Sequence, residues 1–294
     1  MRRGLVAFSA LTLIALGVTG CGLFRFEQRE PWRAQAEEAC VSQRLVQPSA
    51  YMSRSSAIDG PGACGISYPF KVSALAGGSV GLSSRGTLAC PIIPSIDAWL
   101  NEVVQPAASL YFGAAVAEVK SGSYSCRPRN NRSGAKLSEH AFGNALDIAV
   151  FTLADGRKIA VKTGWHGAPE EQGFLRDVQG AACDQFNTVL APGSNRFHYD
   201  HIHVDLMRRG SGHKICNPDQ IPGDVVAARA AKDRGYALRS EPGVTGALGR
   251  DTGRARTASL NGRSVKAKPK SKVRNILSDD DDDWIEDDGP RPSD

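Results

Sequence analysis

Two short segments of this sequence contain four of its six histidines, and both also carry carboxylates. The first runs from Ser138 to Asp147 and reads SEHAFGNALD, and the second runs from Phe197 to Asp205 and reads FHYDHIHVD. Imidazole and carboxylate groups are ligands of catalytic zinc, which usually takes three from the protein and leaves one position for water. The two segments therefore predict a zinc site that would activate water for hydrolysis.

The second segment reads as a strand over Phe197 to Leu206, in which successive side chains point to opposite faces of a sheet. The apolar residues at alternate positions would then face a core. The polar residues between them would point together into a cleft: His201, His203 and Asp205. Two imidazoles from this strand and an aspartate from another strand would complete a three-ligand zinc site.

The pattern S-x-H-x-x-G-x-A-x-D, followed downstream by H-x-H, resembles the zinc D-Ala-D-Ala peptidases and the LAS group of wall-cutting metallopeptidases. The spacing from His140 to Asp147 matches the H-x6-D of that group. The run H-x-x-H-x-H over residues 198–203 is similar to the penicillin-insensitive murein endopeptidase. These motifs point to cleavage of peptide bonds in the wall polymer peptidoglycan.

A wider part of the chain, about residues 30–217, resembles the bacterial extensin-like C-terminal domain family. The resemblance is carried by Cys126 and Arg127, by the segment 138–151 and by the late H-x-H. The Ser-Pro-rich repeats of plant extensins are absent from this sequence.

The resemblance implies that His140, Asp147 and His203 are the zinc ligands. It also implies that Gly143 is small because the chain packs closely between the first two ligands, and that Ser138 helps to fix the loop that presents His140.

Three residues are candidates for the general base, which must come within about 3 Å of the attacking water. The carboxypeptidase branch has a glutamate at the position of Asp200, and the H-x-H branch has a histidine at the position of His201. Strand alternation points His201 into the site and Asp200 away, so we prefer His201, although Asp200 would turn inward if the strand began after it. His198 would orient the substrate or share the acid–base role, and Arg127 would stabilise the carbonyl oxygen or the substrate carboxylate.

The elements that must position these residues are helices mixed with short strands. A helix is expected from Pro31 to about Leu45, with Pro31 suited to its first turn. A strand is expected over 145–151, and a helical region interrupted at Gly180 over 169–190. The order shows no regular strand–helix alternation, which favours an α+β fold. We expect a small antiparallel sheet that carries the zinc site, with helices packed outside it and disulfides stabilising the domain.

The sequence has seven cysteines and no CxxC pair, which argues against a structural zinc knot. Cys21 belongs to the N-terminal signal. The other six suit three disulfides in an oxidising compartment, with pairings that spacing alone does not determine: Cys40, Cys64, Cys90, Cys126, Cys183 and Cys216.

The first 21 residues read as a lipoprotein signal peptide. Arg2 and Arg3 precede an apolar stretch over 4–18, and the following VTGC resembles a lipobox whose cysteine, Cys21, is lipidated. Several acyl chains on that cysteine would anchor the protein stably to a membrane. Gly22, rather than aspartate, follows the cysteine, which favours the periplasmic side of the outer membrane.

The rest of the chain divides by composition into a tether, a catalytic domain, a boundary segment and a tail: 22–30, 31–217, 218–230 and 231–294. The tail has few large apolar residues and is basic before it becomes acidic from Asp279 onward, so we expect it to be disordered.

Charge and composition exclude little but agree with this reading. The net charge is +5, and the basic residues are not interleaved with aromatic ones, so nucleic acid is not an expected partner. The expected partners are peptidoglycan peptides and, through the anchor, a membrane. The predicted function is zinc-dependent hydrolysis of an amide bond in wall stem peptides or cross-links. The alternative is a lipoprotein that keeps the zinc fold only to bind wall peptide or a partner protein.

Overall fold

The computed structural model describes residues 28–233. The predicted signal peptide with Cys21, most of the predicted tether and the tail from residue 234 onward lie outside the described residues. Among the helices of the described part, none combines the length and the apolar character needed to cross a membrane.

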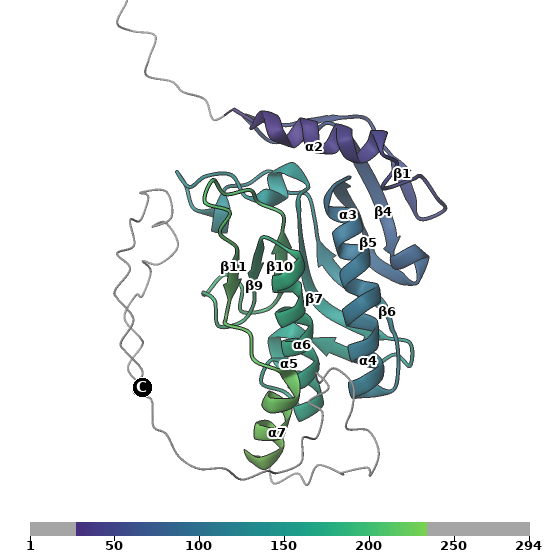
Figure 1. The fold of residues 1–294 in the computed structure, drawn as a ribbon, viewed down its shortest axis with the longest axis vertical. Helices are drawn as coiled ribbons and strands as arrows, with labels where there is room; N and C mark the ends of the chain where they lie inside the picture. Colours follow the sequence, from purple (N-terminus) through teal and green to yellow (C-terminus); the bar gives the residue numbers. More distant parts are fainter. Residues whose placement is uncertain (1–27, 234–294) are drawn as a thin grey trace, which may run out of the picture. The chain divides into compact units, whose positions relative to one another are not determined.

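A single nine-stranded sheet forms the centre of the domain (Figure 1). Its main path runs in the order β1-β4-β5-β6-β7-β10-β9-β11, and β8 pairs with β7 beside β10. The strands are β1 (Met52–Arg54), β4 (Pro69–Leu75), β5 (Val80–Ala89), β6 (Val116–Gly122), β7 (Ala145–Leu153), β8 (Lys158–Ala160), β9 (Thr188–Leu190), β10 (Ile202–Asp205) and β11 (Ile215–Asn217). A separate two-stranded sheet consists of β2 (Ile58–Asp59) and β3 (Gly65–Ile66).

The mixed fold with several helices and disulfides is confirmed, but the prediction of a small antiparallel sheet is wrong. The sheet is large, and β5 pairs with β6 and β9 with β11 in parallel. Strands as short as β1, β9 and β11 have no readable periodicity, because a few residues cannot display an alternation. They enter the sheet through pairing with distant segments, which the local sequence does not reveal.

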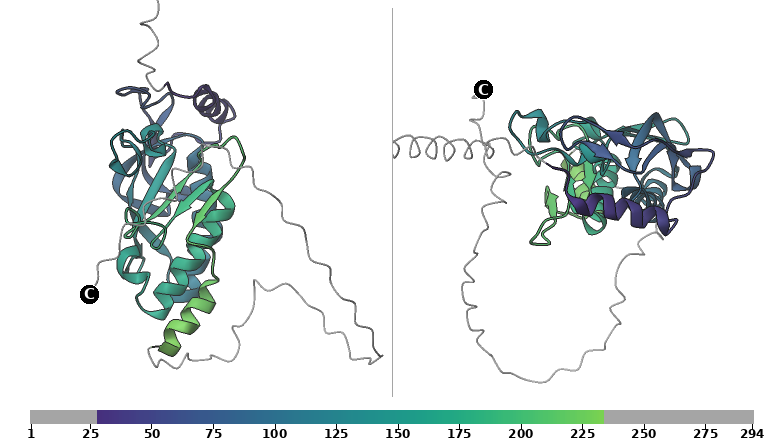
Figure 2. Two further views of the ribbon diagram at one scale, coloured as in Figure 1. Left: turned by 90° about the vertical axis from the view of Figure 1, so that its left-hand side faces the viewer. Right: turned by 90° about the horizontal axis from the view of Figure 1, so that it is seen from above.

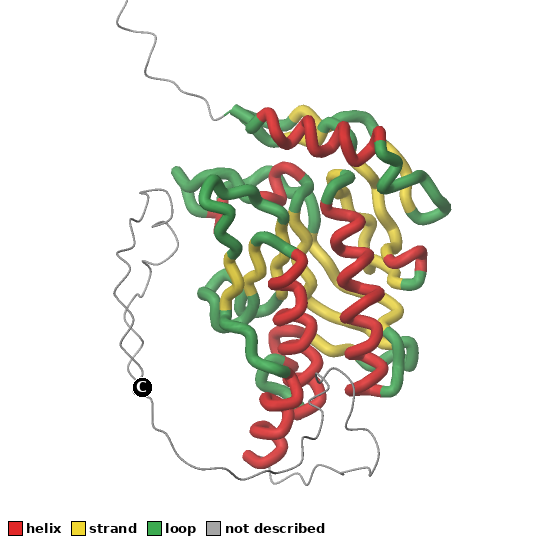
Figure 3. The backbone as a smooth tube through the Cα atoms, viewed as in Figure 1, coloured by secondary structure: helices red, strands yellow, loops and turns green. Residues whose placement is uncertain are grey.

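Helices α3 (Ile92–Trp99), α4 (Gln105–Phe112) and α6 (Pro169–Gln185) cover one face of this sheet (Figure 2), and Figure 3 shows them in front of the strands, whereas α2 (Pro31–Ser42) runs across the top of that view. The helical elements are α2 (Pro31–Ser42), α3 (Ile92–Trp99), the π-helical turn η2 (Leu100–Val104), α4 (Gln105–Phe112), α5 (Val161–Gly164), α6 (Pro169–Gln185) and α7 (Gly223–Asp233). Short 3-10 turns occur at η1 (Ala76–Gly78), η3 (Arg129–Asn131) and η4 (Glu139–Phe142).

The core lies between the sheet and the layer formed by α3, α4 and α6. Trp99 is fully buried there, donates its indole N–H to the backbone carbonyl of Val178 at 3.0 Å, and packs edge-on against Phe186. Leu146 and Ile148 of β7, and Ile202 and Val204 of β10, face this core. The residues between them must therefore face the opposite side of the sheet.

Several predicted element boundaries change in the structure. Helix α6 passes through Gly180 without interruption, since one glycine costs a helix only about 1 kcal/mol. It ends at Gln185, and the end of the predicted helical region forms β9 instead. Strand β10 begins at Ile202 rather than Phe197, and the predicted start of the tail at residue 231 falls inside α7.

The six predicted disulfide cysteines form three disulfides: Cys40–Cys90, Cys64–Cys126 and Cys183–Cys216. The first attaches α2 to the end of β5, the second attaches the loop after β6 to the β2–β3 segment, and the third attaches α6 to β11. The prediction of three disulfides is thus confirmed, and the structure determines which cysteines pair.

Candidate metal centre

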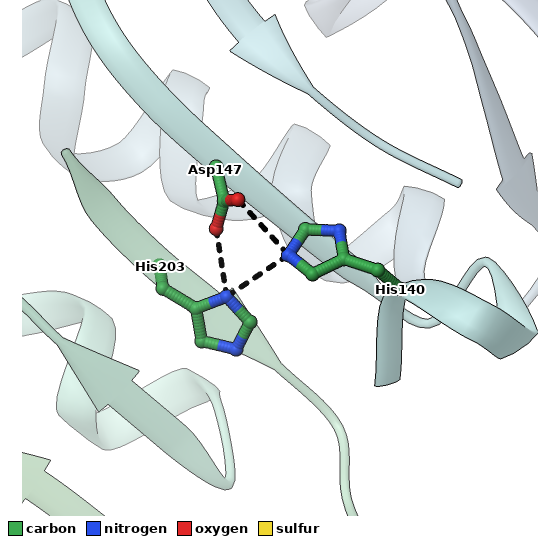
Figure 4. A group of neighbouring side chains, drawn as sticks. All are labelled: His140, Asp147 and His203. Carbon is green, nitrogen blue, oxygen red and sulfur yellow. Dashed lines mark hydrogen bonds and ion pairs between the residues drawn. The ribbon is translucent and has the colours of Figure 1, made fainter. Parts of the chain in front are cut away.

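Three of the predicted site residues converge on the sheet face opposite the helical layer (Figure 4). The pairing of β10 with β7 places His203 directly opposite Asp147, and His140 reaches the same point from η4. His203 Nδ1 lies 2.7 Å from Asp147 Oδ1, and His140 Nε2 lies 3.1 Å from Asp147 Oδ2 and 3.2 Å from His203 Nδ1. The three side chains form a group that could hold a metal ion.

The spacing of these donor atoms suits a small cation. A tetrahedral zinc ion with bonds of about 2.0–2.1 Å would separate its ligand atoms by about 3.3 Å. The observed separations of 2.7–3.2 Å are slightly shorter, so small outward movements of His140, Asp147 and His203 would admit the ion.

The tautomers of both histidines are determined by acceptors behind them. His140 Nδ1 lies 2.6 Å from the backbone carbonyl oxygen of Ser123, and His203 Nε2 lies 3.0 Å from Asp205 Oδ2. A carbonyl or a carboxylate only accepts, so each of these ring nitrogens carries the proton. With a metal bound, the other nitrogen of each ring would present its lone pair to the ion, which is the arrangement that metal-binding histidines require.

The turn that carries His140 has a local explanation. Ser138 caps η4, where its Oγ accepts a hydrogen bond from the His140 backbone N–H at 3.4 Å. Gly143 ends the turn with φ +62°, and a Cβ at this position would lie 2.4 Å from Ile66 Cδ1. Glycine is the residue that combines this backbone conformation with such a close approach.

Sequence reasoning missed a buried ion pair directly behind this turn. Arg33 of α2 binds Glu139 through two hydrogen bonds of 2.7 and 2.6 Å, and both side chains are buried. Asn144 donates to the same carboxylate at 2.6 Å. The position of Glu139 beside His140 in the motif was the only available signal, because Arg33 lies far away in the sequence.

The two carboxylates of the site, Asp147 and Asp205, favour a positive charge on His203. Burial opposes ionisation of Asp147, but the imidazoles of His140 and His203 offset it and lower the pKa of Asp147 well below its usual range. Burial also opposes a charged His203, yet Asp147 and Asp205 raise the pKa of His203 to about 10. His198 differs, because burial and the neighbouring imidazoles lower its pKa to about 3. A cation bound between the carboxylate and the two histidines would take the place of that positive charge.

The base candidates lie beside this group, in the turn before β10. His201 Nε2 is 3.5 Å from Asp147 Oδ1, and His201 Nδ1 is 2.8 Å from Asp200 Oδ1. Because β10 starts at Ile202, strand alternation does not determine where the side chains of Asp200 and His201 point. The His201 ring is oriented instead by its hydrogen bond to Asp200. The His198 ring centre lies 5.0 Å from that of His201, and His198 Nδ1 is held at 2.8 Å from Asn195 Oδ1.

Arg127 also reaches the group, with Nη2 3.8 Å from Asp147 Oδ2 and its side chain 30% exposed. The preceding residue, Cys126, is held by its disulfide to Cys64, and the Arg127 carbonyl accepts a hydrogen bond from the backbone of Ser138. The structure thus brings together all seven predicted catalytic and metal-binding residues, which lie in three separate segments of the sequence.

The fold and the site together define a mixed α/β, disulfide-bonded domain with a His-Asp-His group able to hold a metal ion. The family model of the extensin-like protein C-terminus matches residues 38–217, and the chain belongs to this family. No curated protein and no solved structure matches the chain.

Proposed function

We propose that this protein is a zinc-dependent peptidase that hydrolyses an amide bond in the peptide part of peptidoglycan. The observation that carries the proposal is the convergence of His140, Asp147 and His203, with both imidazoles oriented by hydrogen bonds at their outer nitrogens. The sequence likeness to the LAS peptidases and to the murein endopeptidase supports the same chemistry.

The donor set suits zinc, which accepts two imidazoles and one carboxylate in catalytic sites and keeps a further position open. When bound, zinc would polarise a carbonyl oxygen and make water a stronger acid. Asp147 and the two histidines would hold the ion, and Asp205 and the Ser123 carbonyl would keep the imidazoles aligned.

We assign His201 as the general base. Asp200 accepts a hydrogen bond from the Nδ1–H of His201, so the lone pair of Nε2 points toward the metal-binding group. From there it would take a proton from the attacking water and later transfer one to the leaving amine. Asp200 would support this role by orienting the ring and by stabilising its charged form.

Arg127 and His198 complete the proposed site. The Arg127 guanidinium lies 3.8 Å from Asp147 Oδ2 and would offset negative charge on the carbonyl oxygen of the bond being cleaved. Burial keeps His198 neutral, and its position next to His201 suits a role in orienting the substrate.

The proposed substrate agrees with the proposed location. Three disulfides are typical of an oxidising compartment, and the lipobox-like VTGC before Gly22 suggests a lipid anchor in the bacterial envelope. We place the protein on the periplasmic side of the outer membrane, where peptidoglycan is within reach.

The test is to incubate the chain from residue 22 onward with purified muropeptides and zinc, beside the variant His203→Ala. Mass spectrometry of the products would identify new peptide ends and the bond that is cleaved. Release by the wild type alone supports the proposal. Binding of zinc and muropeptide without cleavage would favour the non-catalytic binding protein, and absence of zinc binding would show that the ligand assignment is wrong.

A further inference from the structure

Helix α2 is connected to the metal-site turn by a buried ion pair. The Arg33 Nη1 and Nη2 atoms donate to the two carboxylate oxygens of Glu139, whose side chain is 3% exposed. Glu139 immediately precedes the ligand His140, and its carboxylate also accepts from Asn144, which follows the turn. One carboxylate therefore joins α2 to both ends of the turn that carries His140.

Each of the three nitrogen atoms of the Arg33 guanidinium donates a hydrogen bond to a carboxylate. The Arg33 Nε donates to Glu30 at 2.7 Å, and the Arg33 Cζ atom lies over the ring of Phe142 in η4, 3.7 Å from the ring centre. A planar guanidinium suits this combination of a two-bond ion pair and ring stacking, which lysine cannot reproduce. Loss of Arg33 would leave the buried Glu139 carboxylate without its counter-charge, an arrangement that proteins tolerate poorly.

We propose that Arg33 is a positioning residue for the metal ligand His140. By holding Glu139, it keeps η4 in the conformation that directs His140 Nε2 toward Asp147 and His203. The inference rests on the proposed metal site and makes metal affinity depend on the docking of α2. This helix is the first described helix of the chain.

The same helix offers a matched control. Glu37 is as deeply buried as Glu139, pairs with Arg29 and accepts a hydrogen bond from the backbone N–H of Tyr68 at 2.9 Å. These partners are outside the turn of residues 138–144. In variants of either pair, the Cys40–Cys90 disulfide still attaches α2 to the domain.

The experiment compares Arg33→Gln, Arg33→Lys and the double variant Arg33→Gln/Glu139→Gln with the control Glu37→Gln, all in the chain from residue 22 onward. Zinc affinity is measured by competition with a chelating dye. Amide hydrogen exchange in residues 139–144 is measured separately on the metal-free protein. Thermal unfolding is recorded for every variant, so that a change in affinity can be compared with any change in global stability.

We expect Arg33→Gln to weaken zinc binding by roughly 10- to 100-fold, as for other residues that orient metal ligands, and to accelerate exchange in the turn. Arg33→Lys should have an intermediate effect. The double variant should recover part of the affinity, because it no longer contains an unpaired buried charge. Glu37→Gln should leave both zinc affinity and exchange in the turn close to wild type.

Two results would overturn the positioning role. One is an Arg33→Gln protein with wild-type affinity and exchange, and the other is an equal loss of affinity in Arg33→Gln and Glu37→Gln, which would indicate a general effect of α2. If the wild type binds no zinc, the proposed function fails, while exchange in the metal-free proteins still decides whether Arg33 holds the turn.

Discussion

His203 donates a hydrogen bond from Nε2 to the carboxylate of Asp205, 3.0 Å away and two positions further along β10. The two side chains share a face because they are at alternate positions of one strand. The bond leaves Nδ1 of His203 as the nitrogen that faces Asp147. A single strand thus supplies both a candidate metal ligand and the group that orients it.

Replacement of Asp205 should therefore weaken metal binding without removing a ligand. For Asp205→Ala we expect a loss of about 10- to 100-fold in zinc affinity, because the imidazole of His203 loses its orienting acceptor. Asp205→Asn should lose less zinc affinity, since its amide oxygen can still accept the hydrogen bond from His203 Nε2. Competition with a chelator measures the effect, and Asp155→Asn, in an exposed turn, is the control. Unchanged affinity in Asp205→Ala would contradict the orienting role.

Removal of a proposed ligand should abolish stoichiometric metal binding. The variants His140→Ala and His203→Ala should each lose bound zinc after dialysis, whereas His213→Ala should retain it, because His213 is exposed and does not belong to the metal-binding group. Elemental analysis of the dialysed proteins measures the zinc content. Retention of one zinc per chain in His203→Ala would show that the ion binds elsewhere.

Removal of the proposed base should separate catalysis from metal binding. In His201→Ala we expect zinc content near wild type and a turnover rate reduced by about 10²- to 10⁴-fold, the usual contribution of a general base. Asp200→Asn should cause a smaller loss, because it changes the support of His201 and not the base itself. Muropeptide cleavage assays on zinc-loaded proteins test this order. A larger loss in Asp200→Asn than in His201→Ala would make Asp200 the base.

The stability of the metal-free protein should depend on pH through His203. Its pKa is about 10 in the folded metal-free protein and about 6.5 in an unfolded chain. Because the folded value is the higher one, the stabilisation is complete below about pH 6.5 and is lost as the pH rises through about 10. Thermal unfolding with a chelator present should show a falling Tm over this range. With zinc bound, the ion replaces the proton and the decline should be weaker, and an identical decline in both forms would contradict this linkage.

The disulfide next to Arg127 should affect activity more than the disulfide between α6 and β11. Replacing either pair by alanines, Cys64/Cys126 or Cys183/Cys216, should cost about 2–4 kcal/mol in the free energy of unfolding. Only the first change loosens the segment that carries Arg127, so it should lower turnover at temperatures where both variants are folded. Denaturant unfolding and cleavage assays make the comparison, and equal turnover in the two variants would argue against this role.

The sequence by itself determined which residues are candidate metal ligands and part of the local structure. The types and spacing of His140, Asp147 and His203 are properties of the chain, as are the six cysteines that form disulfides. The strand around Asp147 was predictable because every residue of 145–151 except Asp147 is apolar, and a short apolar run of this length is typical of a buried strand. The family membership was also recognisable from the motifs and is confirmed over residues 38–217.

Only the tertiary structure decided how these residues meet. It set the register that places His203 opposite Asp147, the Ser123 carbonyl that orients His140, and the pairing of the cysteines. It also places Arg33 of α2 in contact with Glu139 of the turn, and it pairs short strands with the rest of the sheet. These contacts join segments that are distant in sequence, and their geometry depends on the packing free energy of the whole core. No local pattern of residue types contains that information.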